Sequence, residues 1–206
     1  MGELRQGDNV YKMIHPLIQT RIASHLYVVT LLHEQEDLLE RCQQMADALL
    51  KAFQEGKKVL FCGNGGSAAD AQHLAAELSG RYYFDRPPLY AEALHVNTSY
   101  LTAVSNDYGY EEIYARLLRA MGTPGDVLVA LSTSGNSDNV LKAIAAAREQ
   151  GMIVIGMTGM DGGKMAQLCD VLINIPSKDT PRIQECHMLL GHIVCEIVEQ
   201  TLFKKP

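Results

Sequence analysis

Apolar positions in the first quarter of the chain follow a helical period. From about Val10 to Lys57 they recur every three or four residues, and Gly56 is suited to end the second of two helices. Two long helices are therefore predicted, with Pro16 near the start of the first. A helix that is apolar on two sides needs two surfaces to bury it, so we expect contacts with the core and with a partner subunit.

From Lys58 onward, short runs rich in Val, Ile and Leu alternate with helical patterns. Strands are predicted over 58–63, 89–96, 126–133, 153–159 and 171–176, and helices over 67–78, 99–107, 110–121, 137–151, 162–169 and 181–203. Strands joined by helical crossovers pair in parallel, so the sequence predicts an α/β fold with a doubly wound parallel sheet flanked by helices. Ligands of such folds collect at the carboxyl ends of the strands. We expect residues 1–57 to form an N-terminal helical pair used in oligomerisation and residues 58–206 to form the α/β domain.

Composition and charge narrow the classes of function. The 206 residues carry a formal net charge of −6, which argues against a general nucleic-acid binder. No apolar run approaches the ~20 residues that span a bilayer, and the polar first residues do not resemble a signal peptide. The five cysteines show no metal-finger spacing and are expected to be buried thiols. We therefore predict a cytoplasmic protein without direct contact to membranes or nucleic acid.

A glycine-rich stretch, CGNGGS, follows the first predicted strand and precedes a helix. Gly63, Gly65 and Gly66 permit a positive φ and let a ligand approach the backbone closely. Ser67 is placed to cap the helix, whose free N–H groups favour an anion. The lysine and the third glycine of nucleotide-binding loops are missing. The stretch is either a ligand-binding loop or a tight turn.

A hydroxyl-rich stretch follows the third predicted strand and also precedes a helix. Its hydroxyl groups belong to Ser132, Thr133, Ser134 and Ser137. Each hydroxyl can donate to a phosphate oxygen, whereas an N-cap needs only one of them. We therefore favour binding of a phosphate monoester over a simple cap. Because the loop contains no Lys or Arg, a compact sugar phosphate is favoured over a triphosphate with magnesium.

Nitrogen and oxygen ligands recur on two predicted helices. His73 and Glu77 are four residues apart and share a helix face, and the last helix carries Gln184, His187 and His192 in an otherwise apolar segment. A surface pair and satisfied core histidines are the alternatives to a functional site.

A metal site follows from this set if four of the side chains meet. His73, Glu77, Gln184 and His192 are a plausible set of zinc ligands, although Gln is a poor one. Gln184 and His192 are roughly 12 Å apart along one helix. The four ligands reach one ion more easily if a neighbouring subunit contributes Gln184 or His192, so we expect an inter-subunit site.

Several long motifs, in order, give the chain a family resemblance. From about Val59 to the end it resembles the sugar-isomerase (SIS) domain proteins of the phosphoheptose isomerase group, and the N-terminal helices look alike too. The motifs are FCGNGGSAADAQHLAAELSGR, SNDYGY, GDVLVALSTSGNSDNVLKAI, TGMDGGKMA and RIQECHMLLGH.

The resemblance implies an activity and roles for individual residues. It implies conversion of sedoheptulose 7-phosphate into D-glycero-D-manno-heptose 7-phosphate, an early step towards ADP-heptose and lipopolysaccharide core heptose. Glu77 and His192 would be the acid–base pair that moves a proton through an enediol. Substrate contacts are implied for Asn64, Gly65, Gly66, Ser67, Glu77, Asn106, Asp107, Ser132, Thr133, Ser134, Ser137 and Gln184. One zinc ion per subunit is implied at His73, Glu77, Gln184 and His192, in a homotetramer with active sites at subunit interfaces.

The same family contains replication-initiator-associating adaptors of the DiaA type, which are the alternative reading. One such adaptor lacks the acidic residue at the position of Glu77 and has Asn at the position of His192, whereas this chain keeps both groups, so the enzyme is favoured. Pro181 stands where an enterobacterial isomerase of this group has Asp. Glu92 and His95 stand in a strand that is mostly apolar in relatives, and an edge position or a subunit contact is expected for them.

Overall fold

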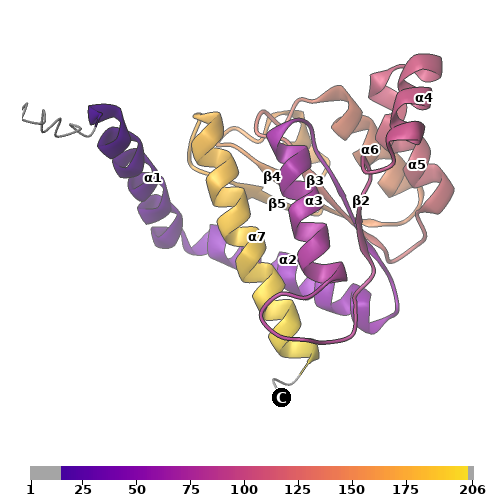
Figure 1. Ribbon diagram of the computed structural model, residues 1–206, viewed down its shortest axis with the longest axis horizontal. Coiled ribbons are helices and arrows are strands. Elements are labelled where there is room, and N and C mark those ends of the chain that lie inside the picture. Colours follow the sequence, from indigo (N-terminus) through magenta and orange to yellow (C-terminus); the bar gives the residue numbers. More distant parts are fainter. Residues whose placement is uncertain (1–14, 204–206) are drawn as a thin grey trace, which may run out of the picture.

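The computed structural model describes residues 15–203, which form a parallel five-stranded sheet between two layers of helices (Figure 1). The strand order is β2-β1-β3-β4-β5 and every neighbouring pair is parallel. The strands are β1 (Val59–Cys62), β2 (Ala91–Ala93), β3 (Val127–Leu131), β4 (Ile153–Thr158) and β5 (Val171–Asn174). The predicted doubly wound α/β fold is confirmed.

Three helices cover each face of the sheet. On one face lie α2 (Glu36–Gln54), α3 (Gly66–Ser79) and α7 (Thr180–Leu202). On the other lie α4 (Thr98–Tyr108), α5 (Ile113–Met121) and α6 (Asp138–Glu149). Two short 3-10 helices, η1 (Tyr110–Glu112) and η2 (Gly163–Gln167), complete the connections.

Alternate residues of each strand enter the two cores. In β1, Phe61 belongs to the core under α2, α3 and α7, whereas Leu60 and Cys62 belong to the core under α4, α5 and α6. Since both faces of the sheet are covered, the central strands are apolar throughout, which is why the sequence shows continuous apolar runs there rather than alternation. All five cysteines are free thiols, four of them buried.

The N-terminal helices match the prediction within the described residues. Helix α1 (Pro16–Glu34) begins at Pro16, and α2 follows after one residue. Gly56 ends the pair with a φ of +67°. In Figure 1, α1 extends away from the sheet, and only its residues Val28 and Leu32 are buried. Helix α2 packs into the same core as the sheet. The boundary between 1–57 and 58–206 stays a prediction.

The edge strand and the connection before β5 differ from expectation. Strand β2 is limited to Ala91–Ala93 instead of 89–96, and the helix predicted over 162–169 is the short 3-10 helix η2. Because β2 lies at the edge of the sheet, the expected edge position of Glu92 is confirmed. His95 follows the strand and is half-buried, and this burial lowers its pKa. Within residues 15–203, no helix has the length and apolarity to cross a bilayer.

Candidate active site

The glycine-rich loop after β1 leads into α3 without a side-chain cap. Gly65 is the N-cap and has a φ of +56°, and no side chain caps the helix within the described chain. Of the three glycines that permit a positive φ, only Gly65 adopts one. Gly63 and Gly66 are needed for space instead, because a Cβ at Gly63 would lie 2.6 Å from the Ser67 carbonyl oxygen and one at Gly66 would clash with Gln184 Nε2.

Ser67 does not cap α3, contrary to prediction, because it lies inside the first turn and is buried. The amides of Ser67, Ala68 and Ala69 donate instead to the carbonyls of Asn64 and Gly65, so the backbone itself closes the first turn of α3.

A pair of amide side chains joins this loop to α6. Asn64 Nδ2 donates to Asn139 Oδ1 at 2.8 Å, and Asn139 Nδ2 donates back to Asn64 Oδ1 at 2.8 Å. The Tyr110 hydroxyl donates to the same Asn64 oxygen at 3.1 Å, and the Tyr114 hydroxyl donates to the Gly63 carbonyl at 2.5 Å. The loop after β1 is thus fixed against the start of α6 and against the segment after α4.

The hydroxyl-rich loop after β3 turns at Gly135, which has a φ of +63° and no space for a Cβ against the Gly162 carbonyl. Ser137 is the N-cap residue of α6, but its hydroxyl lies 3.1 Å from the Ser132 hydroxyl instead of capping the helix. The Ser134 hydroxyl accepts from the Asn136 amide at 3.2 Å. Hydroxyl groups and the uncapped start of α6 therefore gather at the carboxyl end of β3, as a phosphate site requires.

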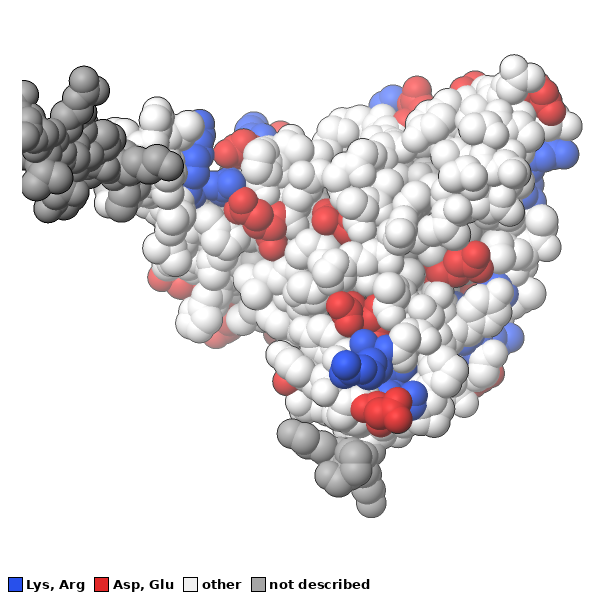
Figure 2. Space-filling model, viewed as in Figure 1, with Lys and Arg blue, Asp and Glu red and all other residues white. Residues whose placement is uncertain are grey.

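His73, Glu77 and His192 form a cluster where α3 and α7 lie side by side. His73 Nε2 lies 3.1 Å from Glu77 Oε1 and 3.1 Å from His192 Nε2. One ligand atom from each of the three residues lies within 4.8 Å of the others. The side chain of His73 is 50% exposed and that of Glu77 25%, so the cluster opens to the surface. Figure 2 shows few charged side chains on the surface over α3.

The donor set of this cluster fits a zinc ion. Two imidazole nitrogens and a carboxylate oxygen are common zinc ligands, and atoms this close can reach one ion. Gln184 lies two turns away in the same chain, against Gly66. The rise from Gln184 to His192 is about 12 Å, so the structure does not bring the four predicted ligands together within one subunit.

His187 belongs to the core. It is fully buried, and its Nε2 lies 3.2 Å from the Thr158 carbonyl oxygen. Burial lowers the pKa of His187 to about 4, against a weaker opposing effect of the hydrogen bond to Thr158. The alternative of a core histidine therefore holds for His187, with one ring nitrogen hydrogen-bonded, and does not hold for His192.

The remaining predicted substrate residues lie at the end of α4. Asn106 and Asp107 are exposed, and Asn106 Nδ2 donates to Asp107 Oδ1 at 2.9 Å. Tyr110, three residues later, contacts the loop after β1 through Asn64. This end of α4 therefore lies near the glycine-rich loop.

Pro181 occupies the first turn of α7, where its ring is compatible with the helix because the first amide groups have no partner inside it. The N-cap of α7, Asp179, makes no side-chain cap within the described residues. The substitution relative to the enterobacterial sequence is thus compatible with the backbone.

Three residues near the site received no role from the sequence. Asp70 lies on α3 one turn before His73, and burial raises its pKa to about 6 while His73 lowers it. The Tyr82 ring stacks on His192 with centroids 5.8 Å apart. Lys178 lines a cavity of about 320 Å³ beside Thr133 and Ser134. Asp70 is part of a motif quoted above. Tyr82 and Lys178 lie in connections between elements, and the periodicity of the sequence does not predict the path of such connections.

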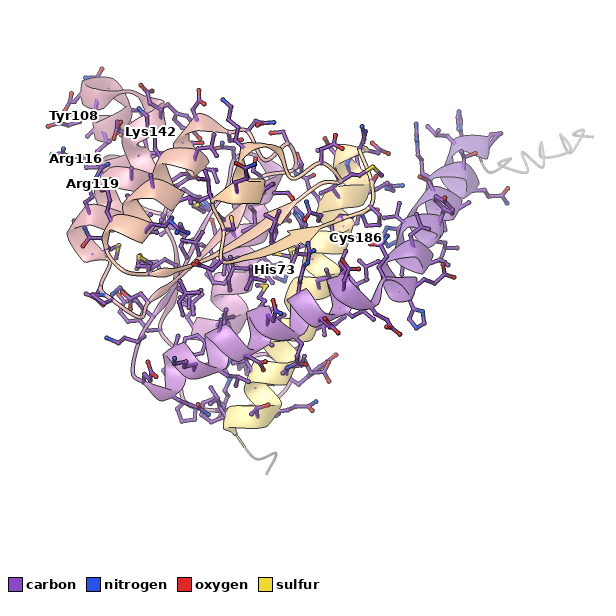
Figure 3. All side chains as sticks on the ribbon, turned by 180° about the vertical axis from the view of Figure 1, so that it is seen from behind. His73, Tyr108, Arg116, Arg119, Lys142 and Cys186 are labelled. Carbon is purple, nitrogen blue, oxygen red and sulfur yellow. The ribbon has the colours of Figure 1, made fainter. Side chains whose placement is uncertain are left out.

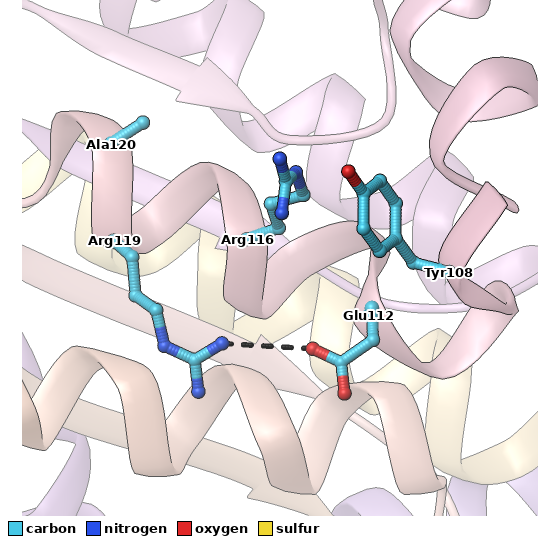
Figure 4. Close-up of a pocket in the computed structure, with 5 residues that line it drawn as sticks. All are labelled: Tyr108, Glu112, Arg116, Arg119 and Ala120. Atoms are coloured by element: carbon cyan, nitrogen blue, oxygen red, sulfur yellow. Dashed lines mark ion pairs between the residues drawn. The ribbon is translucent and has the colours of Figure 1, made fainter.

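A larger groove lies away from these residues. It has a volume of about 570 Å³ and is lined by Tyr108, Glu112, Arg116, Arg119 and Ala120 (Figure 4). Tyr108, Arg116, Arg119 and Lys142 gather at the end of the molecule opposite α1 (Figure 3). Arg119 pairs with Glu112 at 3.6 Å. Since none of the predicted site residues lines this groove, it is not the candidate active site.

Known proteins resemble the chain in sequence. Residues 27–159 match the family model described as SIS domain. The chain is 50% identical to a phosphoheptose isomerase of Aneurinibacillus thermoaerophilus over 91% of this chain and 94% of the relative. It is 60% identical to a phosphoheptose isomerase of Rhodospirillum rubrum over 77% of this chain and 85% of the relative.

Solved structures agree with these relatives. The phosphoheptose isomerase GmhA of Neisseria gonorrhoeae superimposes with a TM-score of 0.80 at 46% identity, covering 89% of this chain and 99% of that one. A phosphoheptose isomerase from Francisella tularensis gives a TM-score of 0.86 at 34% identity, covering 91% and 100%. The adaptor alternative receives no support from these similarities.

Proposed function

The chain belongs to the phosphoheptose isomerases of the SIS-domain family, and on that premise we propose that it converts sedoheptulose 7-phosphate into D-glycero-D-manno-heptose 7-phosphate. The observation that carries the proposal is the cluster of Glu77 and His192 with His73, on the helix that begins at the glycine-rich loop. A carboxylate and an imidazole at one point supply the groups that proton transfer needs.

The two loops hold the phosphate end of the sugar in this proposal. The hydroxyls of Ser132, Thr133, Ser134 and Ser137 donate to phosphate oxygens, together with the free amides at the start of α6. Asn64, Gly65, Gly66 and Ser67 line the substrate at the start of α3. Asn106 and Asp107 bind sugar hydroxyls, and Gln184 contacts the substrate next to Gly66.

The reacting carbons lie at the cluster. Isomerisation removes a proton from C1 and returns one to C2, while the hydroxyl proton moves from O1 to O2. Glu77 and His192 carry these transfers, one as base and the other as acid, through a cis-enediol. His73 lies about 10 Å of helix rise beyond Gly66, so phosphate and reacting carbons are bound far apart, as a long sugar phosphate requires.

We propose zinc as the cofactor, held by His73, Glu77 and His192 with Gln184 as a fourth ligand. A bound zinc ion would polarise the sugar carbonyl. Because Gln184 of the same chain lies two turns from the cluster, the set is completed most easily across a subunit interface. A tryptic or thermal assay of the metal-free protein would report whether the ion also stabilises the fold.

We further propose a homotetramer with active sites at subunit interfaces. Helix α1 exposes a set of large apolar side chains, and α7 exposes two more next to the cluster: Leu17, Ile18, Ile22, Leu26, Tyr27, Leu189 and Ile193. Burying such a surface on a second subunit would also shield the half-exposed cluster from water. A cytoplasmic location and a supply of heptose for lipopolysaccharide core through ADP-heptose belong to the same proposal.

Isomerisation of sedoheptulose 7-phosphate in deuterated water tests the activity. Turnover with deuterium entering at C2 supports the enediol route. Glu77→Gln should lower kcat at least ~100-fold while the fold is retained, because it removes a group that accepts or donates the proton. Glu111→Gln, the same change at an exposed glutamate, is the control. Normal turnover by the Glu77 variant would contradict the assignment.

A further inference from the structure

A buried ion pair lies two helical turns beyond the cluster, between the connection after α3 and the end of α7. Arg86 Nε donates to Glu199 Oε1 at 3.0 Å, and each side chain is only 1% exposed. Desolvating two charges is costly, and a pair of this kind is not in itself evidence of stability. The role of the pair is therefore judged from the groups that its other donor and acceptor atoms bind.

The guanidinium group of Arg86 binds the end of α3. It donates through NH2 to the Glu77 carbonyl at 2.8 Å and through NH1 to the Leu78 carbonyl at 2.9 Å and the Gly80 carbonyl at 3.3 Å. A cation at a helix C-terminus satisfies carbonyl groups that lack partners inside the helix. One of these carbonyls belongs to Glu77 itself, so the backbone that carries the candidate acid–base group is bound directly.

The carboxylate of Glu199 binds the connection after α3. Its Oε1 accepts from the Tyr82 amide at 2.9 Å, and its Oε2 accepts from the Tyr83 amide at 2.7 Å. The ring of Tyr82 in turn stacks on His192, which lies seven residues before Glu199 on α7. Seven residues are two turns, so Glu199 and His192 share one face of that helix.

We propose that Arg86 and Glu199 are positioning residues that set the register of α3 against α7 and thereby hold Glu77 and His192 together. A slip of one residue along either helix is a shift of about 1.5 Å. Ligand distances at a metal site tolerate only about 0.2 Å. The pair is thus placed to control the geometry of the cluster without touching the substrate. Its kinetic consequences rest on the proposed function, but its effect on the geometry does not.

The chain offers a matched control that contacts neither α3 nor α7. Asp126 is also 1% exposed, and it accepts from the amides of Lys58 and Thr123 and from the Lys58 ammonium group at 2.6 Å. It thus has the same kinds of partner as Glu199, but it joins the residues that precede β1 and β3. Asp126→Asn should lower stability through a comparable loss and leave the cluster unchanged.

The test compares Glu199→Gln with Asp126→Asn at a temperature where circular dichroism shows both to be folded. Three quantities are measured: histidine ring NMR shifts of the metal-free protein, zinc affinity by competition with a chromogenic chelator, and kcat with KM for sedoheptulose 7-phosphate. We expect Glu199→Gln to move the His73 and His192 signals, to weaken zinc binding roughly 10- to 100-fold and to lower kcat more than it raises KM. Asp126→Asn should change none of these.

Arg86→Lys keeps the positive charge but loses the branched guanidinium group that donates to the carbonyls of α3. It should shift the same histidine signals and weaken zinc binding by less than Glu199→Gln does. If Glu199→Gln does not fold, the Arg86→Lys protein provides the test. Equal histidine signals and zinc affinities in the Glu199, Arg86 and Asp126 variants would overturn the proposal. A wild-type protein without isomerase activity would contradict the proposed function alone, because the NMR comparison needs neither metal nor substrate.

Discussion

His187 should make the protein lose stability as the pH falls, because its imidazole is buried in the neutral form. The side chain is fully buried, its Nε2 contacts the Thr158 carbonyl, and Nδ1 has no partner among residues 15–203. Burial lowers its pKa from 6.5 to about 4. In the unfolded chain the same group is exposed to water and is protonated near its ordinary pKa.

The size and sign of the effect follow from these two values. Between pH 6.5 and about 4 the unfolded chain binds the proton and the folded protein does not. The stability that neutral His187 contributes is therefore complete above pH 6.5 and is lost as the pH falls towards 4. At about 1.4 kcal/mol per pKa unit, the loss amounts to about 3 kcal/mol.

This loss of stability is measured by urea unfolding of the wild type and of His187→Gln at pH 7 and pH 4, at one protein concentration. The difference in unfolding free energy between the two proteins should change by about 3 kcal/mol in favour of the variant at pH 4. His33→Gln reports what the same replacement does at an exposed histidine. A change below about 1 kcal/mol for His187→Gln would refute the argument from burial.

Three further substitutions test the loops. Gly66→Ala should displace Gln184, because the new Cβ clashes with its amide, and raise KM at least ~10-fold with little loss of stability, as steady-state kinetics would show. Ser137→Ala should raise KM by roughly 3- to 10-fold, since it removes one phosphate donor at about 1 kcal/mol, and an unchanged KM would remove Ser137 from the site. Tyr114→Phe should lower the unfolding free energy by about 1–3 kcal/mol, because the Gly63 carbonyl loses its buried donor, and denaturant titration would detect this.

The sequence predicts the elements well because their patterns are local. The apolar runs of β1 and β3 identify buried parallel strands, and the i, i+4 spacing of His73 and Glu77 suffices to place both on one face of α3. Glycine after a helix likewise marks the turn at Gly56. Each of these inferences depends only on neighbours in the chain.

The relative placement of α3 and α7 is not local, and periodicity does not predict it. Whether His187 or His192 meets His73 depends on the rotation of α7 about its axis, which its even apolar character does not specify. The contact between Arg86 and Glu199 joins residues 113 positions apart. The cap expected at Ser67 is wrong because Gly65 turns the chain earlier, and Ser67 is drawn into the core.

The uncapped helices at the carboxyl edge of the sheet couple binding to thermal stability. The N-cap residues Gly65, Ser137 and Asp179 make no side-chain cap in the described chain. A missing cap costs about 1 kcal/mol, so the ligand-free protein is less stable at these helix starts, including that of α6, which would receive the phosphate. A bound phosphate ester supplies the absent acceptors and should raise the melting temperature. Mutations that install caps would stabilise the free protein and compete with the substrate, so thermostability and affinity at this edge cannot be improved by the same change.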